Sequence, residues 1–401
     1  MNIPHEKFCV LPWISLEASP IGTVRPCCLA DNEVVDNCNK KFNLLEANLR
    51  DIQNSKYMER IRQTFLNKHL PKTCRRCWAE EDAGRTSKRM HTLNRLKDIL
   101  TDEVKWSLEP KNLMFLDLKL GNICNLKCRI CGSWSSSTYA SEELKALPKS
   151  KRKESFAYDM QRKGAWARES HIFWDELKDN MHSLRYIEFT GGEPFMIAEH
   201  FKFLQTLIDN NLSQNIEIHY NTNGTLYPEE AEEIWKHFKH VEIAFSIDDV
   251  GKRFEYQRTG ADWYRVQSNI QRFKKLQEHL HNISLQVCCT INIFNVYYLE
   301  EVANWIETQE FDFVYWNMLH DTPQHCITSL PDNAKKVISA RLLNAEVLNN
   351  TKQEFASVVD FMKNKGESRF AVLQDIRKVD ARRNVKLTNN HLELAYLIGY
   401  E

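Results

Sequence analysis

The chain has 401 residues, of which 42% are apolar, enough for one large domain or for one large and one small domain. Lysine and arginine total 54, as do aspartate and glutamate, so the balanced charge gives no general attraction to nucleic acid or to an anionic membrane. We see no signal peptide and no run near the ~18 apolar residues of a membrane helix, and therefore expect a soluble, cytoplasmic protein.

Cysteine is the most informative residue type in this composition. Nine of the 12 cysteines precede position 132, and several fall in closely spaced pairs. Disulfides are rare in a reducing cytoplasm. Clustered cysteines in such a compartment usually bind metal, so we expect metal sites in the first third of the chain.

Residues 1–90 are predicted to form a small cysteine-rich α+β domain. An amphipathic pattern over residues 45–65 predicts one helix. Four cysteines flank it: Cys9, Cys27, Cys74 and Cys77. Four thiolates complete a metal's coordination shell, so the set suits structure or electron transfer rather than substrate activation. Cys28 is an alternative to Cys27, Cys38 is a further candidate ligand, and a structural zinc site is the alternative to an iron–sulfur cluster.

Residues 91–110 are expected to form a linker helix, and residues 111–320 alternate short apolar runs with amphipathic helices. The predicted strands are residues 113–120, 184–190, 215–221, 241–247, 283–291 and 311–317. This alternation indicates crossover connections and a parallel sheet, so the predicted fold is α/β, a partial (βα)6 barrel. Residues 321–401 are predicted to be a helical C-terminal extension.

Polar or glycine-bearing segments follow the first four predicted strands of this region. They begin at Gly121, Thr190, Thr222 and Ser246. Function in parallel α/β sheets lies at the carboxyl ends of the strands. We therefore expect these segments to build one site.

The first of these segments leads into three cysteines in eight residues, Cys124, Cys128 and Cys131, with the spacing C-x3-C-x2-C. Iron–sulfur clusters are normally held by four thiolates, so three leave one iron free for another ligand. A zinc knuckle or three core cysteines is the alternative. Zinc would need a fourth ligand, and residues 132–137 contain neither Cys nor His.

This triplet, followed after the second strand by Gly191-Gly192-Glu193-Pro194, resembles the radical S-adenosylmethionine (SAM) superfamily over residues 111–320. The resemblance implies a [4Fe–4S] cluster whose open iron binds SAM, and reductive cleavage to a 5′-deoxyadenosyl radical that abstracts a substrate hydrogen. The residue before the third cysteine is usually aromatic in this family, whereas here it is Ile130.

The resemblance also implies SAM contacts outside the cysteines. The candidates are Gly191, Gly192, Glu193, Pro194, Asn223, Ser246, Asp248 and Arg258. Glycines allow close approach of the backbone to a ligand, and arginine forms two parallel bonds with a carboxylate. An ordinary turn, an N-cap serine and a surface arginine are the alternatives.

The N-terminal pattern C-x12-G-x4-C, helix, C-x2-C resembles the twitch domain, a short form of the SPASM domain that holds auxiliary [4Fe–4S] clusters. Such domains usually follow the barrel, whereas this one precedes it. No further cysteine lies between Cys77 and Cys124, so we expect one auxiliary cluster.

The predicted function is that of a radical SAM enzyme acting on a peptide or a small molecule, assisted by the auxiliary cluster. An electron donor such as flavodoxin or ferredoxin is the expected partner, with neither membrane nor nucleic acid involved. The alternative is a cysteine-rich zinc protein with a structural or binding role.

Overall fold

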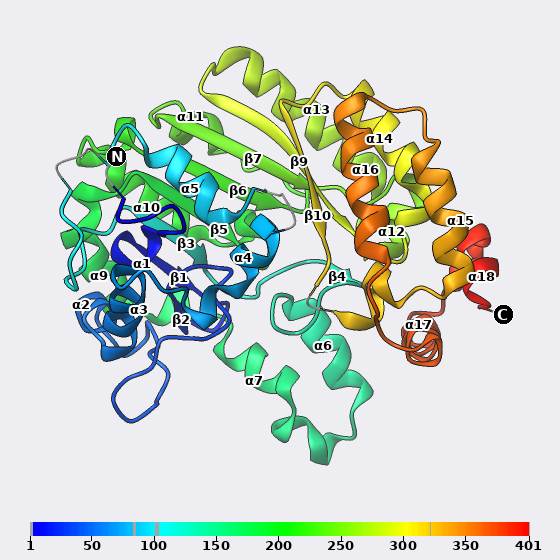
Figure 1. Cartoon of the computed structure of the whole chain (residues 1–401), viewed down its shortest axis with the longest axis horizontal. Coiled ribbons are helices and arrows are strands. Elements are labelled where there is room, and N and C mark those ends of the chain that lie inside the picture. Colours follow the sequence, from blue (N-terminus) through cyan, green and yellow to red (C-terminus); the bar gives the residue numbers. More distant parts are fainter. Residues whose placement is uncertain (1–2, 83–85, 101–103, 321, 401) are drawn as a thin grey trace. The chain divides into compact units, whose positions relative to one another are not determined.

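The computed structural model describes residues 3–82, 86–100, 104–320 and 322–400. The chain divides into two compact units. Figure 1 labels the helices and strands of the chain. Unit 1 comprises Met1–Cys124, Ser133–Tyr220 and Glu230–Val241, and unit 2 comprises Asn125–Gly132, Asn221–Glu229 and Glu242–Glu401. The domain limits expected near residues 90, 110 and 320 remain a prediction. Residues 101–103 of the expected linker helix lie outside the described residues.

The fold is α/β with a mostly parallel sheet, as predicted. The hydrogen-bonded strand order is β10-β9-β7-β6-β5-β3-β1-β2. Unit 1 contains β1 (Ser15–Ala18), β2 (Val24–Arg25), β3 (Phe115–Lys119) and β5 (Tyr186–Thr190). Unit 2 contains β4 (Lys127–Cys128), β8 (Arg258–Thr259), β9 (Ile283–Ile291) and β10 (Phe313–Met318). The strands β6 (Glu217–Thr222) and β7 (His240–Ser246) are divided between the units.

All six predicted strands are confirmed as β3, β5, β6, β7, β9 and β10. Their side chains explain this result, since β9 alternates buried and half-buried residues along its length and β3 is buried over four successive residues. The pairs β3–β5, β5–β6 and β9–β10 are parallel. The strand β1, which was not predicted, pairs in parallel with β3 and joins the cysteine-rich region to the sheet of unit 1.

The helix predicted over residues 45–65 is wrong in one respect, because it is two helices. The helices are α2 (Leu49–Gln53) and α3 (Lys56–Leu66). Ser55 has extended backbone, and its hydroxyl accepts a hydrogen bond from the Met58 N–H, so it caps α3. An N-cap serine starts a new helix. The apolar residues of both helices are nevertheless buried, so the apolar pattern alone does not reveal the break.

The remaining helices of unit 1 are α1 (Leu11–Ile14), α4 (Arg75–Asp82), α5 (Lys88–Leu96), α6 (Ser137–Ala146), α7 (Phe156–Lys163), α8 (Trp166–Glu169), α9 (His171–Asn180), α10 (Ala198–Asp209) and α11 (Ala231–Trp235). Those of unit 2 are α12 (Gly251–Gln257), α13 (Trp263–His279), α14 (Leu299–Thr308), α15 (Asp332–Leu343), α16 (Asn349–Met362), α17 (Arg369–Arg383) and α18 (Leu392–Ile398). The helical C-terminal region is therefore confirmed. Among the described residues, no helix is both long and apolar enough to cross a membrane.

Candidate functional site

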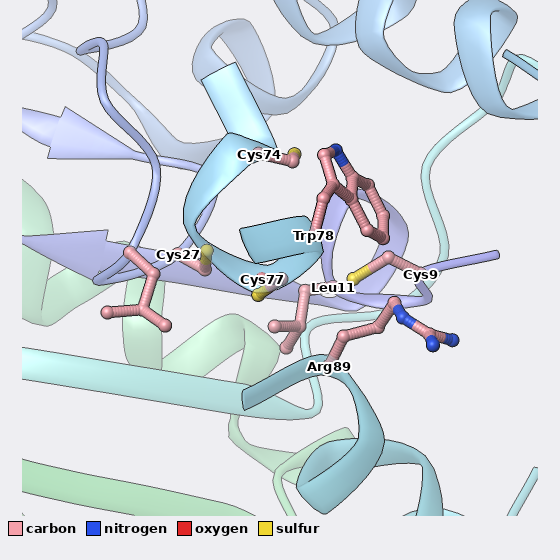
Figure 2. Close-up of a pocket in the computed structure, with 8 residues that line it drawn as sticks. Cys9, Leu11, Cys27, Cys74, Cys77, Trp78 and Arg89 are labelled. Carbon is pink, nitrogen blue, oxygen red and sulfur yellow. The ribbon is translucent and has the colours of Figure 1, made fainter. Parts of the chain in front are cut away.

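Four cysteines from separate segments of unit 1 line one pocket, as Figure 2 shows. They are Cys9, Cys27, Cys74 and Cys77. Cys9 lies just before α1, Cys27 just after β2, Cys74 at the end of a 3-10 turn, and Cys77 in the first turn of α4. The sequence therefore brings together the four thiols that its spacing singled out.

The electrostatics of this pocket suit a bound cation. Burial raises the pKa of Cys9, and the neighbouring Cys74 and Cys77 thiols raise it further by mutual repulsion. Burial, together with Cys9 and Cys77, raises the pKa of Cys27 to about 12. Four thiolates that line one pocket repel one another, so a metal ion or cluster is needed to hold them deprotonated. This pocket fits a metal centre with four cysteine ligands.

Arg89 is a pocket residue that the sequence analysis missed. Its guanidinium makes a bidentate ion pair with Glu81, at 2.8 Å from Nε and 2.8 Å from Nη2, and donates to the Phe8 carbonyl over 3.1 Å. The guanidinium carbon lies 5.9 Å from the Trp78 ring centre. Arg89 thus joins α4 to the segment that carries Cys9, and its charge lowers the pKa of that thiol against the larger effect of burial.

The two alternative cysteines have different surroundings. Cys38 is exposed. The Cys28 sulfur lies in a group with one carboxylate oxygen each of Asp117 and Glu188, all within 4.8 Å of one another. This position places Cys28 outside the residues that line the four-cysteine pocket and supports Cys27 as the ligand.

The carboxylates beside Cys28 already have cationic partners. Lys88 Nζ lies 2.5 and 2.7 Å from the two oxygens of Glu188, and Lys119 Nζ lies 3.4 Å from Asp117. Burial acts to raise the pKa of Glu188, but the Lys88 ammonium and His219 outweigh it, and the pKa is lowered. We interpret the group as an ion-pair cluster on β3, β5 and α5 rather than as a second metal site.

Two loops at the carboxyl ends of β3 and β5 meet in unit 1. The Glu193 N–H donates to the Ile123 carbonyl over 2.8 Å. Gly192 has φ +59°, and a Cβ there would lie 2.5 Å from the Ile123 oxygen, so only glycine fits. The Glu193 side chain is fully buried, and its Oε1 accepts from the Phe195 N–H over 3.3 Å. Cys124, at the end of the first loop, is buried, and its carbonyl accepts a hydrogen bond from the Thr138 hydroxyl.

Cys128 and Cys131 belong to unit 2, where β4 pairs in antiparallel fashion with β8 and sets Cys128 opposite Arg258. Arg258 Nη1 lies 3.8 Å from Cys128 Sγ, and Nη2 lies 2.6 Å from Asp248. Burial raises the pKa of Cys128. Burial and the neighbouring Cys128 raise the pKa of Cys131 to about 12, and in both cases the Arg258 charge acts in the opposite direction. Both thiols therefore need a cation to be deprotonated, and Arg258 supplies positive charge beside them.

Arg258 also has a free donor. Its Nε is buried and has no hydrogen-bond partner among the described residues. A buried donor without a partner is unfavourable unless a ligand supplies an acceptor. The Arg258 side chain thus fits contact with a bound anionic group such as a carboxylate.

The remaining candidates in unit 2 are engaged with the chain itself. The Asn223 amide donates to Asn125 over 3.0 Å, and its oxygen accepts the Thr225 N–H at 2.9 Å, which braces the cysteine loop. The second carboxylate oxygen of Asp248 accepts the Thr290 N–H over 2.9 Å. Ser246, the last residue of β7, is half-buried.

These arrangements agree with two matches to protein families. The model of the radical SAM superfamily matches residues 118–307, which include the cysteine triplet and Gly191–Pro194. The model of an iron–sulfur cluster-binding domain, SPASM, matches residues 9–78 and so contains all four pocket cysteines. The chain belongs to the radical SAM superfamily.

The chain is also similar to solved structures. They include anSMEcpe with bound AdoMet, at 17% identity and a TM-score of 0.38, where the match covers 64% of each chain. Streptococcus suis SuiB bound to S-adenosylmethionine matches at 11% identity and a TM-score of 0.36, over 92% of this chain and 72% of that chain. SuiB bound to precursor peptide SuiA matches at 13% identity and a TM-score of 0.34, over 70% of this chain and 62% of that chain. The chain thus spans about 64% of the length of anSMEcpe. No curated protein matches the sequence.

Membership in the radical SAM superfamily implies an enzyme with a [4Fe–4S] cluster and SAM. The SPASM domain implies auxiliary iron–sulfur centres, which agrees with the four-cysteine pocket and favours iron over the zinc alternative.

Proposed function

We propose that this radical SAM enzyme abstracts hydrogen from a peptide or small-molecule substrate, with SAM bound at a cluster held by Cys124, Cys128 and Cys131. When bound, that cluster supplies an electron that cleaves SAM to the 5′-deoxyadenosyl radical. The observation that carries the proposal is the division of the cysteines into two sets. One set of four closes a pocket, whereas the loop after β3 contributes three and leaves a coordination position open.

The residues around the triplet have distinct proposed tasks. Arg258 balances the thiolate of Cys128, and its unpartnered Nε is available to the SAM carboxylate. Asp248 fixes the Arg258 guanidinium. Gly191 and Gly192 keep the loop after β5 free of side chains, so that backbone groups there can approach SAM.

The remaining proposed SAM contacts have supporting roles. Glu193, Pro194, Asn223 and Ser246 complete the set. Glu193 and Asn223 brace their own loops, and so would hold the backbone that contacts SAM.

We assign the four-cysteine pocket to one auxiliary [4Fe–4S] cluster. Because Cys9, Cys27, Cys74 and Cys77 provide four ligands, no iron there is left for SAM. The auxiliary cluster would therefore position substrate or transfer electrons. A flavodoxin or ferredoxin in the cytoplasm is the proposed source of the electron.

The test is anaerobic reconstitution, followed by metal analysis and measurement of 5′-deoxyadenosine. Two [4Fe–4S] clusters give about eight irons per chain. Replacing Cys124, Cys128 and Cys131 together by Ala should leave about four irons and abolish SAM cleavage, since only the auxiliary set remains. Stoichiometric zinc without iron in the wild type, or 5′-deoxyadenosine from the triple variant, would contradict the proposal.

A second variant tests the auxiliary role. Cys74→Ala with Cys77→Ala should lose product formation but keep uncoupled SAM cleavage. Circular dichroism on the same sample checks folding, because a structural metal can contribute folding free energy. Exposed Cys38→Ser is the matched control and should keep both clusters. A folded double variant that holds about four irons and forms product at the wild-type rate would show that the auxiliary cluster is dispensable.

A further inference from the structure

Arg129 lies between two cysteines of the triplet and is almost fully buried, with 3% of its surface exposed. Its backbone N–H donates to the Gln257 carbonyl over 2.8 Å, and its Nε donates to the Tyr256 carbonyl over 3.1 Å. The guanidinium carbon lies 3.6 Å from the centre of the Tyr256 ring. Arg129 therefore holds the cysteine loop against the end of α12 through hydrogen bonds and a cation–π contact.

The counter-charge of Arg129 comes from α17, far along the chain, where Asp380 forms an ion pair with the guanidinium. The same carboxylate oxygen accepts the Tyr256 hydroxyl over 2.9 Å. The other oxygen accepts the Tyr400 hydroxyl over 2.6 Å and the Leu387 N–H over 2.9 Å. Asp380 is only 2% exposed. Its carboxylate therefore depends on these four protein donors rather than on water for its hydrogen bonds.

The hydroxyl groups of Tyr256 and Tyr400 act as hydrogen-bond donors to Asp380. Burial and the neighbouring Asp380 carboxylate raise the pKa of Tyr400 to about 12, so the phenol stays protonated at neutral pH. Burial also raises the pKa of Tyr256. Both phenols thus stabilise an ionised Asp380, and the Arg129–Asp380 pair is a fixed charge arrangement.

We propose that Asp380 is a positioning residue that acts through Arg129, by which the C-terminal helices hold the triplet loop and set the charge beside the SAM-binding cluster. The inference rests on the proposed function of Cys124, Cys128 and Cys131. It adds a role for residues 322–400, a region predicted from the sequence only as a helical C-terminal extension.

The physical reason is the charge next to the cluster. Reduction adds negative charge, so net charge and hydrogen bonds near a cluster set its reduction potential. Arg129 alone would stabilise the reduced state, and Asp380 offsets that effect. Two opposite substitutions should therefore shift the potential in opposite directions, which a purely structural brace does not predict.

The experiment is an EPR-monitored redox titration of the reconstituted full chain, with the SAM-binding cluster identified by the change of its signal on adding SAM. Asp380→Asn leaves the Arg129 charge unbalanced, so the midpoint potential should shift to a more positive value. Arg129→Met leaves the buried Asp380 carboxylate without its cationic partner, so the midpoint potential should shift to a more negative value. Asp360→Asn on α16, an exposed residue paired with Lys363, removes the same charge and should leave the potential unchanged.

A second pair of variants keeps the test decisive if a single variant fails to fold, since an unpaired buried charge is strongly destabilising. Arg129→Met combined with Asp380→Leu removes both charges and should return the potential towards the wild-type value. Tyr400→Phe removes one donor from Asp380 and should shift the potential in the same direction as Arg129→Met, by less.

Unchanged potentials in folded, iron-replete variants would overturn the inference while leaving the proposed function intact. A wild-type protein without a SAM-sensitive cluster signal would instead overturn the proposed function itself.

Discussion

One guanidinium nitrogen of Arg258 lies 3.8 Å from the sulfur of Cys128, while another lies 2.6 Å from Asp248. Arginine and aspartate are both buried, so the pair places a balanced charge beside a cysteine of the triplet. From the sequence, Arg258 is expected only as a contact for SAM. The structure adds a role for it in favouring the thiolate of Cys128.

The first prediction concerns this pair. Arg258→Met should reduce the iron content from about eight towards about four per chain, because the remaining Asp248 carboxylate repels the thiolates of the triplet. Iron analysis and EPR on the same sample measure the effect. Arg258→Met with Asp248→Asn removes both charges and should recover part of the iron.

The control for Arg258 is Arg272→Met, which breaks an exposed ion pair with Glu229 in the same unit. The Arg272→Met variant should keep the iron content of the wild type, since exposed ion pairs contribute little to stability. Equal iron content in the Arg258 and Arg272 variants would show that Arg258 does not support the cluster.

Much of the sheet could be predicted because its strands are long enough to show a pattern. β9 alternates over nine residues, whereas β4 and β8 have two residues each and leave no detectable period. The short pair β4–β8 nevertheless sets Cys128 opposite Arg258. Its formation depends on tertiary contacts, which a local sequence pattern does not contain.

The candidate ligands were predictable from spacing, but the side chains that hold their segments in place were not. Cys74 and Cys77 stand out as C-x2-C, whereas Arg89 contacts the Cys9 segment only because α5 folds back onto it. Asp380 lies 251 positions from Arg129, and no sequence signal links them. Spacing along the sequence also left Cys27 and Cys28 equivalent, although their side chains have different neighbours.

The second prediction distinguishes these adjacent cysteines. Cys27→Ser should lose the auxiliary cluster and leave about four irons, because Cys27 lines the pocket with the other three ligands. Cys28→Ser should keep about eight irons, since that sulfur lies beside Asp117 and Glu188 instead. Iron and sulfide analysis after anaerobic reconstitution measures both. The reverse pattern would identify Cys28 as the ligand.

The third prediction concerns the ion pair next to Cys28. Glu188→Met should lower the free energy of unfolding by about 3 kcal/mol, the lower end for a buried pair, because it leaves the Lys88 ammonium without its partner. The side chains are 19% and 11% exposed, which is why we take the lower end. Urea unfolding at constant iron content measures the change.

A double variant and an exposed pair serve as controls for Glu188. Lys88→Met with Glu188→Met should be less destabilised than Glu188→Met alone, since replacing both charges by apolar groups removes the unpaired ion. Lys178→Met, which breaks the exposed pair with Asp175, should cost about 0.5 kcal/mol or less. If Glu188→Met behaves like Lys178→Met, the ion pair is energetically unimportant.

A buried histidine gives unit 1 a pH dependence. His200, on α10, is fully buried among Phe189, Phe201 and Tyr220. Burial lowers its pKa to about 3, although the hydrogen bond to the Ile197 carbonyl acts to raise it. Its Nε2 is buried without a partner among the described residues, so protonation there would place a charge in an apolar site.

The fourth prediction follows from this lowered pKa. The unfolded chain binds a proton at His200 near pH 6.5 and the folded chain does not, so the stability from neutral His200 is present above that pH and decreases as the pH falls. Between pH 7.5 and 5.5 this loss amounts to about 1.4 kcal/mol.

His200→Phe should reduce the pH dependence of the free energy of unfolding by that amount, whatever the stability of the variant at pH 7.5. Urea unfolding at several pH values, with cluster absorbance recorded in parallel, measures the slope. Exposed His171→Asn should retain the wild-type slope, and a His200→Phe slope equal to that of His171→Asn would show that His200 is not the group responsible.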